Sequence, residues 1–145
     1  MLCKGEWFRS ADGIVRPIMR AEILGGDGSW RSIAFLVDTG ADRTVISAGV
    51  LGLLDLYGVQ PEDRIGGVGG LVDSVDVTTQ IRLARGNSQW VTLRGTYAAC
   101  LREETLDISV LGRDILNIFA VIVDRAADRV VLLHGSDSYA IQRRE

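Results

Sequence analysis

The sequence has few of the residues that metal sites and nucleophilic triads require. Its 145 residues include one histidine, His134, and two cysteines, Cys3 and Cys100. The cysteines lie far apart and in no metal-binding spacing, and a single histidine has no partners for a metal cluster or a Ser-His-Asp triad. We therefore expect buried or free thiols, an ordinary surface or edge histidine, no metal ion and no cofactor.

An excess of positive charge and long apolar runs are missing as well. Asp and Glu number 19 against 16 Lys and Arg, for a net charge of -3, whereas nucleic-acid-binding proteins usually carry surplus Lys and Arg. No apolar run approaches membrane-spanning length, and the N-terminal stretch MLCKGEWFRSADG lacks the apolar core and cleavage site of a signal peptide. We expect a cytoplasmic chain that binds neither nucleic acid nor membranes.

The chain does have abundant apolar residues in short runs that glycines interrupt. Hydrophobic residues make up 47% of the sequence, which is enough for one compact core at this length. The sequence contains no evident linker or low-complexity tract. Residues 1–145 are therefore expected to form one domain.

Most apolar residues alternate with polar ones, as they do in half-buried β-strands. In residues 75–83, valine, isoleucine and leucine occupy one face, while Asp, Thr, Gln and Arg occupy the other. Pro17 suggests an edge position for the first long strand. Many short strands with hairpin spacing predict a mostly β architecture, either a barrel or a sandwich. The predicted strands are residues 14–24, 29–37, 75–83, 89–99 and 107–112, with a final hairpin at 118–133.

Two short helical segments are expected between these strands. Residues 47–58 contain clustered leucines and begin at Ser47, a plausible N-cap, although two internal glycines weaken the pattern. Residues 113–117 are expected to form one helical turn.

One stretch, FLVDTGADRTVIS at residues 35–47, places a carboxylate at the end of a predicted buried strand. Asp38 follows five apolar residues and precedes Thr39 and Gly40, residue types that allow a sharp turn and hydrogen bonds back to the carboxylate. An isolated buried charge is costly. The tripeptide alone is equally typical of an Asx-type turn that merely ends a strand, so its surroundings decide between a structural turn and a functional site.

Three motifs together resemble the retroviral-type aspartic proteases, the retropepsins. Residues 38–41 in the stretch above resemble their catalytic loop, RIGGVGGLVDSV at 64–75 resembles their glycine-rich flap, and VLGRDIL at 110–116 resembles their Gly-Arg-Asn/Asp segment. The resemblance implies an all-β fold, a closed or partly open barrel of the retropepsin type with one or two short helices. The final hairpin differs from the short viral C-terminus, so the viral mode of dimer closure does not carry over directly.

The glycine-rich segment has two possible interpretations. Phosphate-binding loops are also rich in glycine, but this one lacks the spacing of G-x-G-x-x-G, a following Lys-Ser/Thr and a helix behind it. We therefore prefer a pliant flap at residues 65–71 that closes over an extended ligand. Its substrate-binding residues are expected to be Gly66, Gly67, Val68 and Gly69, with Val68 at the tip.

The resemblance also implies a chemistry that needs two carboxylates. In such sites one ionised and one protonated carboxyl group share a proton, activate water and polarise the scissile carbonyl. The sequence has one Asp-Thr-Gly and no second Asp-Thr-Gly or Asp-Ser-Gly. A working site would therefore combine Asp38 from two chains of a homodimer. The implied function is hydrolysis of peptide bonds in extended segments of a peptide or protein substrate.

Supporting roles follow from the same resemblance. Thr39 and Gly40 complete the catalytic loop, and Ala41, Asp42 and Arg43 are expected to contact substrate. Asp42 is also expected to pair with Arg113, either as a purely structural ion pair or in addition to binding substrate. Arg43 has a second interpretation as a solvated surface arginine. Four apolar residues have either a subsite or a core role: Val45, Val68, Leu71 and Ile115.

A function without catalysis stays open as the alternative. The fold does not guarantee activity, so the chain is either an aspartic endopeptidase or a retropepsin-like peptide-binding or oligomerisation module. The complete Asp38-Thr39-Gly40 loop favours the enzyme, because a binding module has no need for a costly pair of carboxylates.

Overall fold

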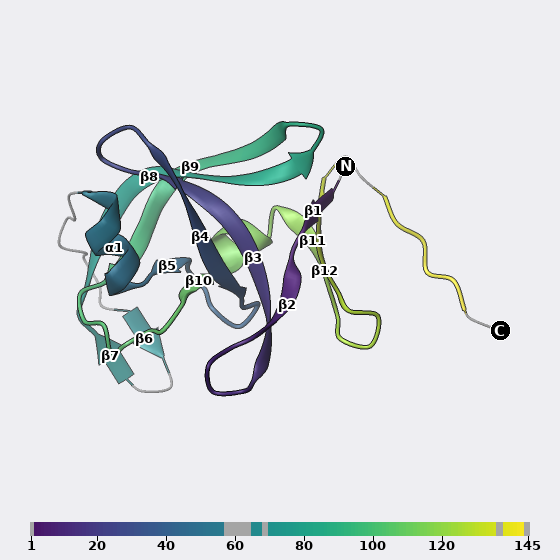
Figure 1. Cartoon of the computed structure of the whole chain (residues 1–145), viewed down its shortest axis with the longest axis horizontal. Coiled ribbons are helices and arrows are strands. Elements are labelled where there is room, and N and C mark those ends of the chain that lie inside the picture. The colour runs from purple at the N-terminus through teal and green to yellow at the C-terminus, as the bar shows by residue number, and fades with distance from the viewer. Residues whose placement is uncertain (1, 57–64, 68–69, 136–137, 144–145) are drawn as a thin grey trace.

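A computed structural model describes residues 2–56, 65–67, 70–135 and 138–143. These residues form a β-barrel with two short helices, a three-stranded sheet beside it and a small separate hairpin (Figure 1). The expectation of an all-β barrel with one or two short helices is confirmed, and the alternative of a sandwich is wrong.

The elements follow the chain in simple order. The strands before the first helix are β1 (Leu2–Lys4), β2 (Glu6–Arg9), β3 (Val15–Leu24), β4 (Trp30–Val37) and β5 (Val45–Ile46). After helix α1 (Ala48–Leu54) come β6 (Ile65–Gly67), β7 (Gly70–Val72), β8 (Ser74–Gly86), β9 (Gln89–Cys100) and β10 (Ser109–Leu111). Helix α2 (Arg113–Leu116) then leads to β11 (Phe119–Asp124) and β12 (Arg129–His134).

The barrel is closed by a pairing between distant strands. The seven-stranded sheet runs β2-β3-β4-β10-β5-β9-β8, and β8 returns to pair with β3 at Glu22↔Arg82 and Ile23↔Ile81. The Arg82 guanidinium forms an ion pair with Glu22 at 2.7 Å and lies 4.0 Å and 4.1 Å from the ring centroids of Trp30 and Trp90. A cation held between two aromatic faces thus reinforces the closing seam on its outer side.

The core fills the interior of this barrel. Its largest fully buried side chains include Phe35, Ile23, Ile81 and Leu111, which come from the four strands β4, β3, β8 and β10. The expected alternation in β8 is present, since Val77, Thr79, Ile81 and Leu83 are buried. A second, smaller cluster contains Val45, Ala98, Cys100 and Val110, with Leu36, Ala41 and Leu106 packed against it.

Several predicted boundaries need correction. Helix α1 begins after Ser47, whose hydroxyl caps it by accepting from the Val50 amide at 3.4 Å. It ends at Leu54 because Asp55 turns into the left-handed conformation with φ 50°, so residues 55 and 56 are not helical, and 57–58 lie outside the described residues. Pro17 does not mark an edge strand, since β3 lies between β2 and β4. The ladder with β4 begins only at Ile18, so β3 pairs on one side at Pro17, where a missing amide is tolerated.

The terminal strands pair within the chain. Strand β1 adds to β12 in antiparallel register, Leu2↔Leu133 to Lys4↔Val131, and β12 pairs with β11 to complete a three-stranded sheet. This sheet lies at the side of the barrel opposite α1 (Figure 1). Strands β1 and β2 were not expected from the sequence. No helix in the part of the chain described here is long and apolar enough to span a membrane.

Candidate active site

Asp38 lies at the end of β4, where three strands meet. Strand β10 runs parallel to β4 and also pairs with β5, and the Asp38 amide donates to the Leu111 carbonyl at 3.1 Å. The Gly40 amide donates to Asp38 Oδ1 at 2.9 Å and the Ala41 amide to the Asp38 carbonyl at 3.2 Å. The loop is therefore an Asx-type turn, and this geometry is compatible with a structural and a functional role alike.

The exposure of this loop differs from the expectation of a buried charge. In the single chain Asp38 is half-buried, while Thr39 and Gly40 are exposed. The turn at the end of β4 therefore stays in contact with solvent. An exposed, ordered polar loop at a strand end is a common setting for a functional site.

A buried network beneath the turn positions the loop. Thr44, which is fully buried, donates its hydroxyl to Asp114 Oδ1 at 2.7 Å and accepts from the Gly112 amide at 3.1 Å. The same Oδ1 accepts from the backbone amides of Thr44 and Ile115, each at 2.9 Å. A side-chain carbon on Gly112 would collide with the backbone of Arg43. Residues 112–115 and the strand after Asp38 thus form one hydrogen-bonded unit.

Sequence reasoning missed Thr44 and Asp114. The signal for Asp114 was present, since it occupies the Asn/Asp position of the motif at 110–116, but only its neighbour Arg113 received a role. Thr44 has no local signal, because a threonine in a strand is ordinary and only the fold brings Asp114 and Gly112 to it.

The expected pairing of Asp42 with Arg113 is present. Arg113 Nη2 donates to Asp42 Oδ1, and the Arg113 amide donates to the Ala41 carbonyl at 2.8 Å. The side chain of Asp42 is 82% exposed, so this ion pair lies at the surface. The carboxylate remains accessible, so the pair does not exclude contact with a ligand.

The remaining predicted residues divide between polar contacts and packing. Arg43 is not a freely solvated arginine, since its Nη2 contacts Asp76 Oδ1 at 3.1 Å and its side chain is 39% exposed. Ala41 and Val45 belong to the smaller apolar cluster, whereas Ile115 is in the main core. Ile115 is 2% exposed, so it packs in the core and does not line a subsite.

The glycine-rich segment is partly described. Strands β6 and β7 pair antiparallel, with Ile65↔Val72, Gly66↔Leu71 and Gly67↔Gly70 in register. The backbone therefore forms a hairpin separate from the barrel sheet. Val68 and Gly69 lie outside the described residues, so the predicted tip is not placed.

The cysteines and the histidine have structural settings. Cys3 and Cys100 are buried and free of disulfides, and burial raises the pKa of the Cys100 thiol. His134 ends β12, where its ring makes an edge contact with Phe119 at 5.9 Å between centroids. Among the residues that the structure describes, no three His, Cys, Asp or Glu side chains gather as a metal site would require.

Comparison with known proteins agrees with this geometry. The family model for the retroviral aspartyl protease matches residues 14–124. The solved structure of EIAV protease complexed with the inhibitor HBY-793 is 27% identical, with a TM-score of 0.55 over 70% of this chain and 86% of that one. A retropepsin-like aspartic protease from Rickettsia conorii is 20% identical, with a TM-score of 0.53 over 91% and 90% of the two chains. A search of curated proteins finds no match.

The family match includes the Asp38 loop, the hairpin at β6 and β7, and the Gly112-Arg113 segment. It covers well over half of the sequence. The chain therefore belongs to the retroviral aspartyl protease family.

Proposed function

We propose that this protein is an aspartic endopeptidase that hydrolyses peptide bonds in extended segments of peptide or protein substrates. The observation that carries the proposal is the Asp38 turn, an ordered loop whose carboxylate stays open to solvent in the single chain. The turn stands on a buried network that a mere strand end does not require. This is the preorganised support that catalytic groups need.

The proposed active species is a homodimer. The sequence supplies one Asp-Thr-Gly, and the mechanism needs two carboxyl groups close enough to share a proton. The exposed Thr39 and Gly40 at the end of β4 leave this loop free to meet its copy across a twofold axis. The half-buried Asp38 would become fully buried at that contact, and proton sharing would offset the cost of burying its charge.

In the proposed mechanism each Asp38 has one of two roles in a given turnover. The ionised carboxylate removes a proton from a water molecule, and the protonated carboxyl donates to the carbonyl oxygen of the scissile bond. The water oxygen adds to the carbonyl carbon to form a tetrahedral diol. The C–N bond then breaks as the amine nitrogen takes the proton held by the first Asp38 and a diol hydroxyl gives its proton to the second, which restores the starting pair. The Gly40 amide, which donates to Asp38 Oδ1 at 2.9 Å, holds the carboxyl orientation throughout.

The hairpin of β6 and β7 is proposed to close over the bound peptide. Among the described residues, β6 and β7 pair only with each other and not with a strand of the barrel sheet. Such a hairpin can move without breaking barrel hydrogen bonds, as a covering flap must. Gly66 and Gly67 would offer backbone amides to an extended substrate.

Cleavage of a diverse peptide pool between acidic and neutral pH tests the proposal. We expect the wild type to cleave while it sediments as a dimer, and Asp38→Asn to lose cleavage with the fold and dimer intact. Asp128→Asn is the matched control, because Asp128 is an exposed turn residue at φ 55°, a conformation that Asn also adopts. An active monomer, or full activity in Asp38→Asn, would refute the proposal. Binding of peptides without any cleavage would favour the binding module instead.

A further inference from the structure

A cavity of about 790 Å³ lies beside the Asp38 loop. Its walls come from the β2–β3 connection, the start of β3, strands β4 and β10, and the loop before β10. The residues that line it are Phe8, Ser10, Ala11, Asp12, Arg16, Leu36, Glu104, Thr105, Leu106, Asp107, Ile108 and Val110.

The floor of this cavity is continuous with the apolar surface next to Asp38. Leu36 and Val110 are cross-strand partners in the β4–β10 ladder. Leu36 is the second residue before Asp38, so at the rise of a strand their Cα atoms lie about 7 Å apart. Leu36, Leu106 and Ala41 pack in one cluster with Val110. A peptide lying across Asp38 would therefore reach the cavity with a neighbouring side chain.

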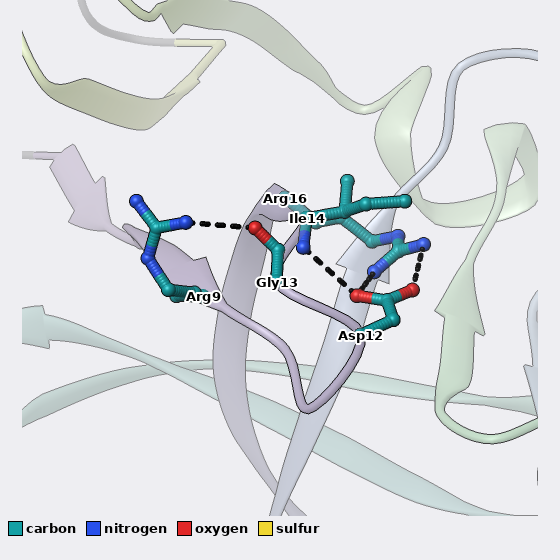
Figure 2. Close-up of polar contacts among 5 residues, drawn as sticks. All are labelled: Arg9, Asp12, Gly13, Ile14 and Arg16. Carbon is teal, nitrogen blue, oxygen red and sulfur yellow. Dashed lines mark hydrogen bonds and ion pairs between the residues drawn. The ribbon is translucent and has the colours of Figure 1, made fainter.

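The single arginine of the cavity is already held by an aspartate. Figure 2 shows Asp12 at the turn between β2 and β3, with Arg16 Nη1 donating to Oδ1 at 3.0 Å and Nη2 to Oδ2 at 2.8 Å. The Ile14 amide also donates to Asp12 Oδ1, at 2.9 Å, and Arg9 Nη1 donates to the Gly13 carbonyl at 2.7 Å. This bidentate geometry fixes the guanidinium plane and uses the arginine's charge locally.

The other two charges of the cavity are acidic. Asp107 is close enough to Arg16 to raise the pKa of that guanidinium together with Asp12. Glu104 and Asp107 are exposed, and neither forms an ion pair with a cation in the described part of the chain. Three carboxylates and one guanidinium leave the lining with an excess of two negative charges above an apolar floor.

We propose that this cavity is a specificity pocket for a lysine or arginine side chain of the substrate, with Asp107 and Glu104 as the residues that select it. The proposal rests on the proposed peptidase function. A long basic side chain suits both features, because its methylene stem can lie on Leu36 and Val110 while its cationic end reaches the acidic rim. Asp12 contributes indirectly, since it keeps Arg16 from neutralising Asp107.

Matched peptides test this selection. Peptides that the wild type cleaves are resynthesised with Lys, norleucine or Glu at each position flanking the scissile bond, and kcat/KM is measured for each. At one position we expect Lys to be preferred over norleucine, and Glu to be disfavoured. The Asp107→Asn/Glu104→Gln double variant should reduce the Lys-to-norleucine ratio by roughly 3- to 30-fold. The preference should also weaken as salt rises, because the rim is exposed.

Two further variants separate the pocket from general charge effects. Glu103→Gln removes the adjacent exposed acid, which does not line the cavity, and should leave the Lys-to-norleucine ratio unchanged. Asp12→Asn releases Arg16 and should reduce that ratio. An equal effect from Glu103→Gln, or no change in the double variant, would overturn the assignment.

Binding to Asp38→Asn protein distinguishes failure of the inference from failure of the proposed function. Fluorescence anisotropy with labelled pool peptides that differ only in Lys, norleucine or Glu at one position measures the preference where no bond is cleaved. A Lys preference in binding without wild-type cleavage would leave the pocket standing and refute the peptidase. Cleavage by the wild type without a basic preference would refute the pocket alone, and absence of both would refute both.

Discussion

Replacement of Thr44 by valine should show how much the buried network under Asp38 contributes to stability. Valine keeps the shape of threonine but has no hydroxyl, so the bonds to Asp114 Oδ1 at 2.7 Å and from the Gly112 amide at 3.1 Å are both lost. The Thr44 amide keeps its bond to Asp114. The change therefore removes two of the contacts that join residues 112–115 to the loop.

The expected magnitude follows from the two groups left behind. Loss of a hydrogen bond to a carboxylate costs about 1.5–3 kcal/mol, and an unpaired buried amide costs about 1–3 kcal/mol. The extra methyl group of valine offsets about 0.8 kcal/mol. We expect the free energy of unfolding to fall by about 2–5 kcal/mol, and the midpoint of thermal unfolding by about 6–15 °C for a domain of this size.

Urea unfolding followed by tryptophan fluorescence measures this loss. Wild type and Thr44→Val are compared at one protein concentration, because dimerisation makes apparent stability depend on concentration. The control is Thr92→Val, at an exposed strand position without a side-chain hydrogen bond among those of the described residues, and its effect should stay within about 0.5 kcal/mol. If Thr44→Val costs no more than Thr92→Val, the network does not support the loop as argued.

Three further predictions concern packing and pH. Gly26→Ala should lower the free energy of unfolding by about 1–3 kcal/mol, because the added carbon would meet the Asp55 carbonyl. The control is Gly52→Ala, at a helical site with open space. It should be neutral or stabilising in the same urea assay. Burial raises the pKa of Tyr97 to about 12, so the folded protein resists deprotonation of its hydroxyl. The resulting stability is present below pH 10 and lost as pH rises from 10 to about 12. Tyr97→Phe should flatten this part of the stability profile, and an unchanged profile would contradict the prediction. Arg16 lowers the pKa of Asp12 to about 2, so the stability that Asp12 contributes is present above about pH 4 and declines towards pH 2. The difference in the free energy of unfolding between wild type and Asp12→Asn should shrink over that interval. A constant difference would show that the ion pair contributes nothing.

Local patterns were sufficient for most of the secondary structure. Alternation predicted β8 because one face of that strand lies in the core, and the hydroxyl of Ser47 predicted the start of α1. Strands β1, β2 and β5 have two to four residues, too few for a period to be visible. They exist because longer strands pair with them, which is information that a short segment does not contain.

The sequence by itself determined the family and the Asp38 loop, because these depend on short, ordered motifs, and the family resemblance predicted the Asp42–Arg113 pair. Only the tertiary structure decided what surrounds them. The β3–β8 pairing closes the barrel, and the parallel pairing of β10 with β4 carries Asp114 beneath Thr44 and Val110 beside Leu36. The pairing of Arg43 with Asp76 and the acidic cavity around Arg16 arise in the same way. The pairs named here join residues 33 to 74 positions apart in the chain, and their formation depends on the closed sheet as a whole, which no local pattern specifies.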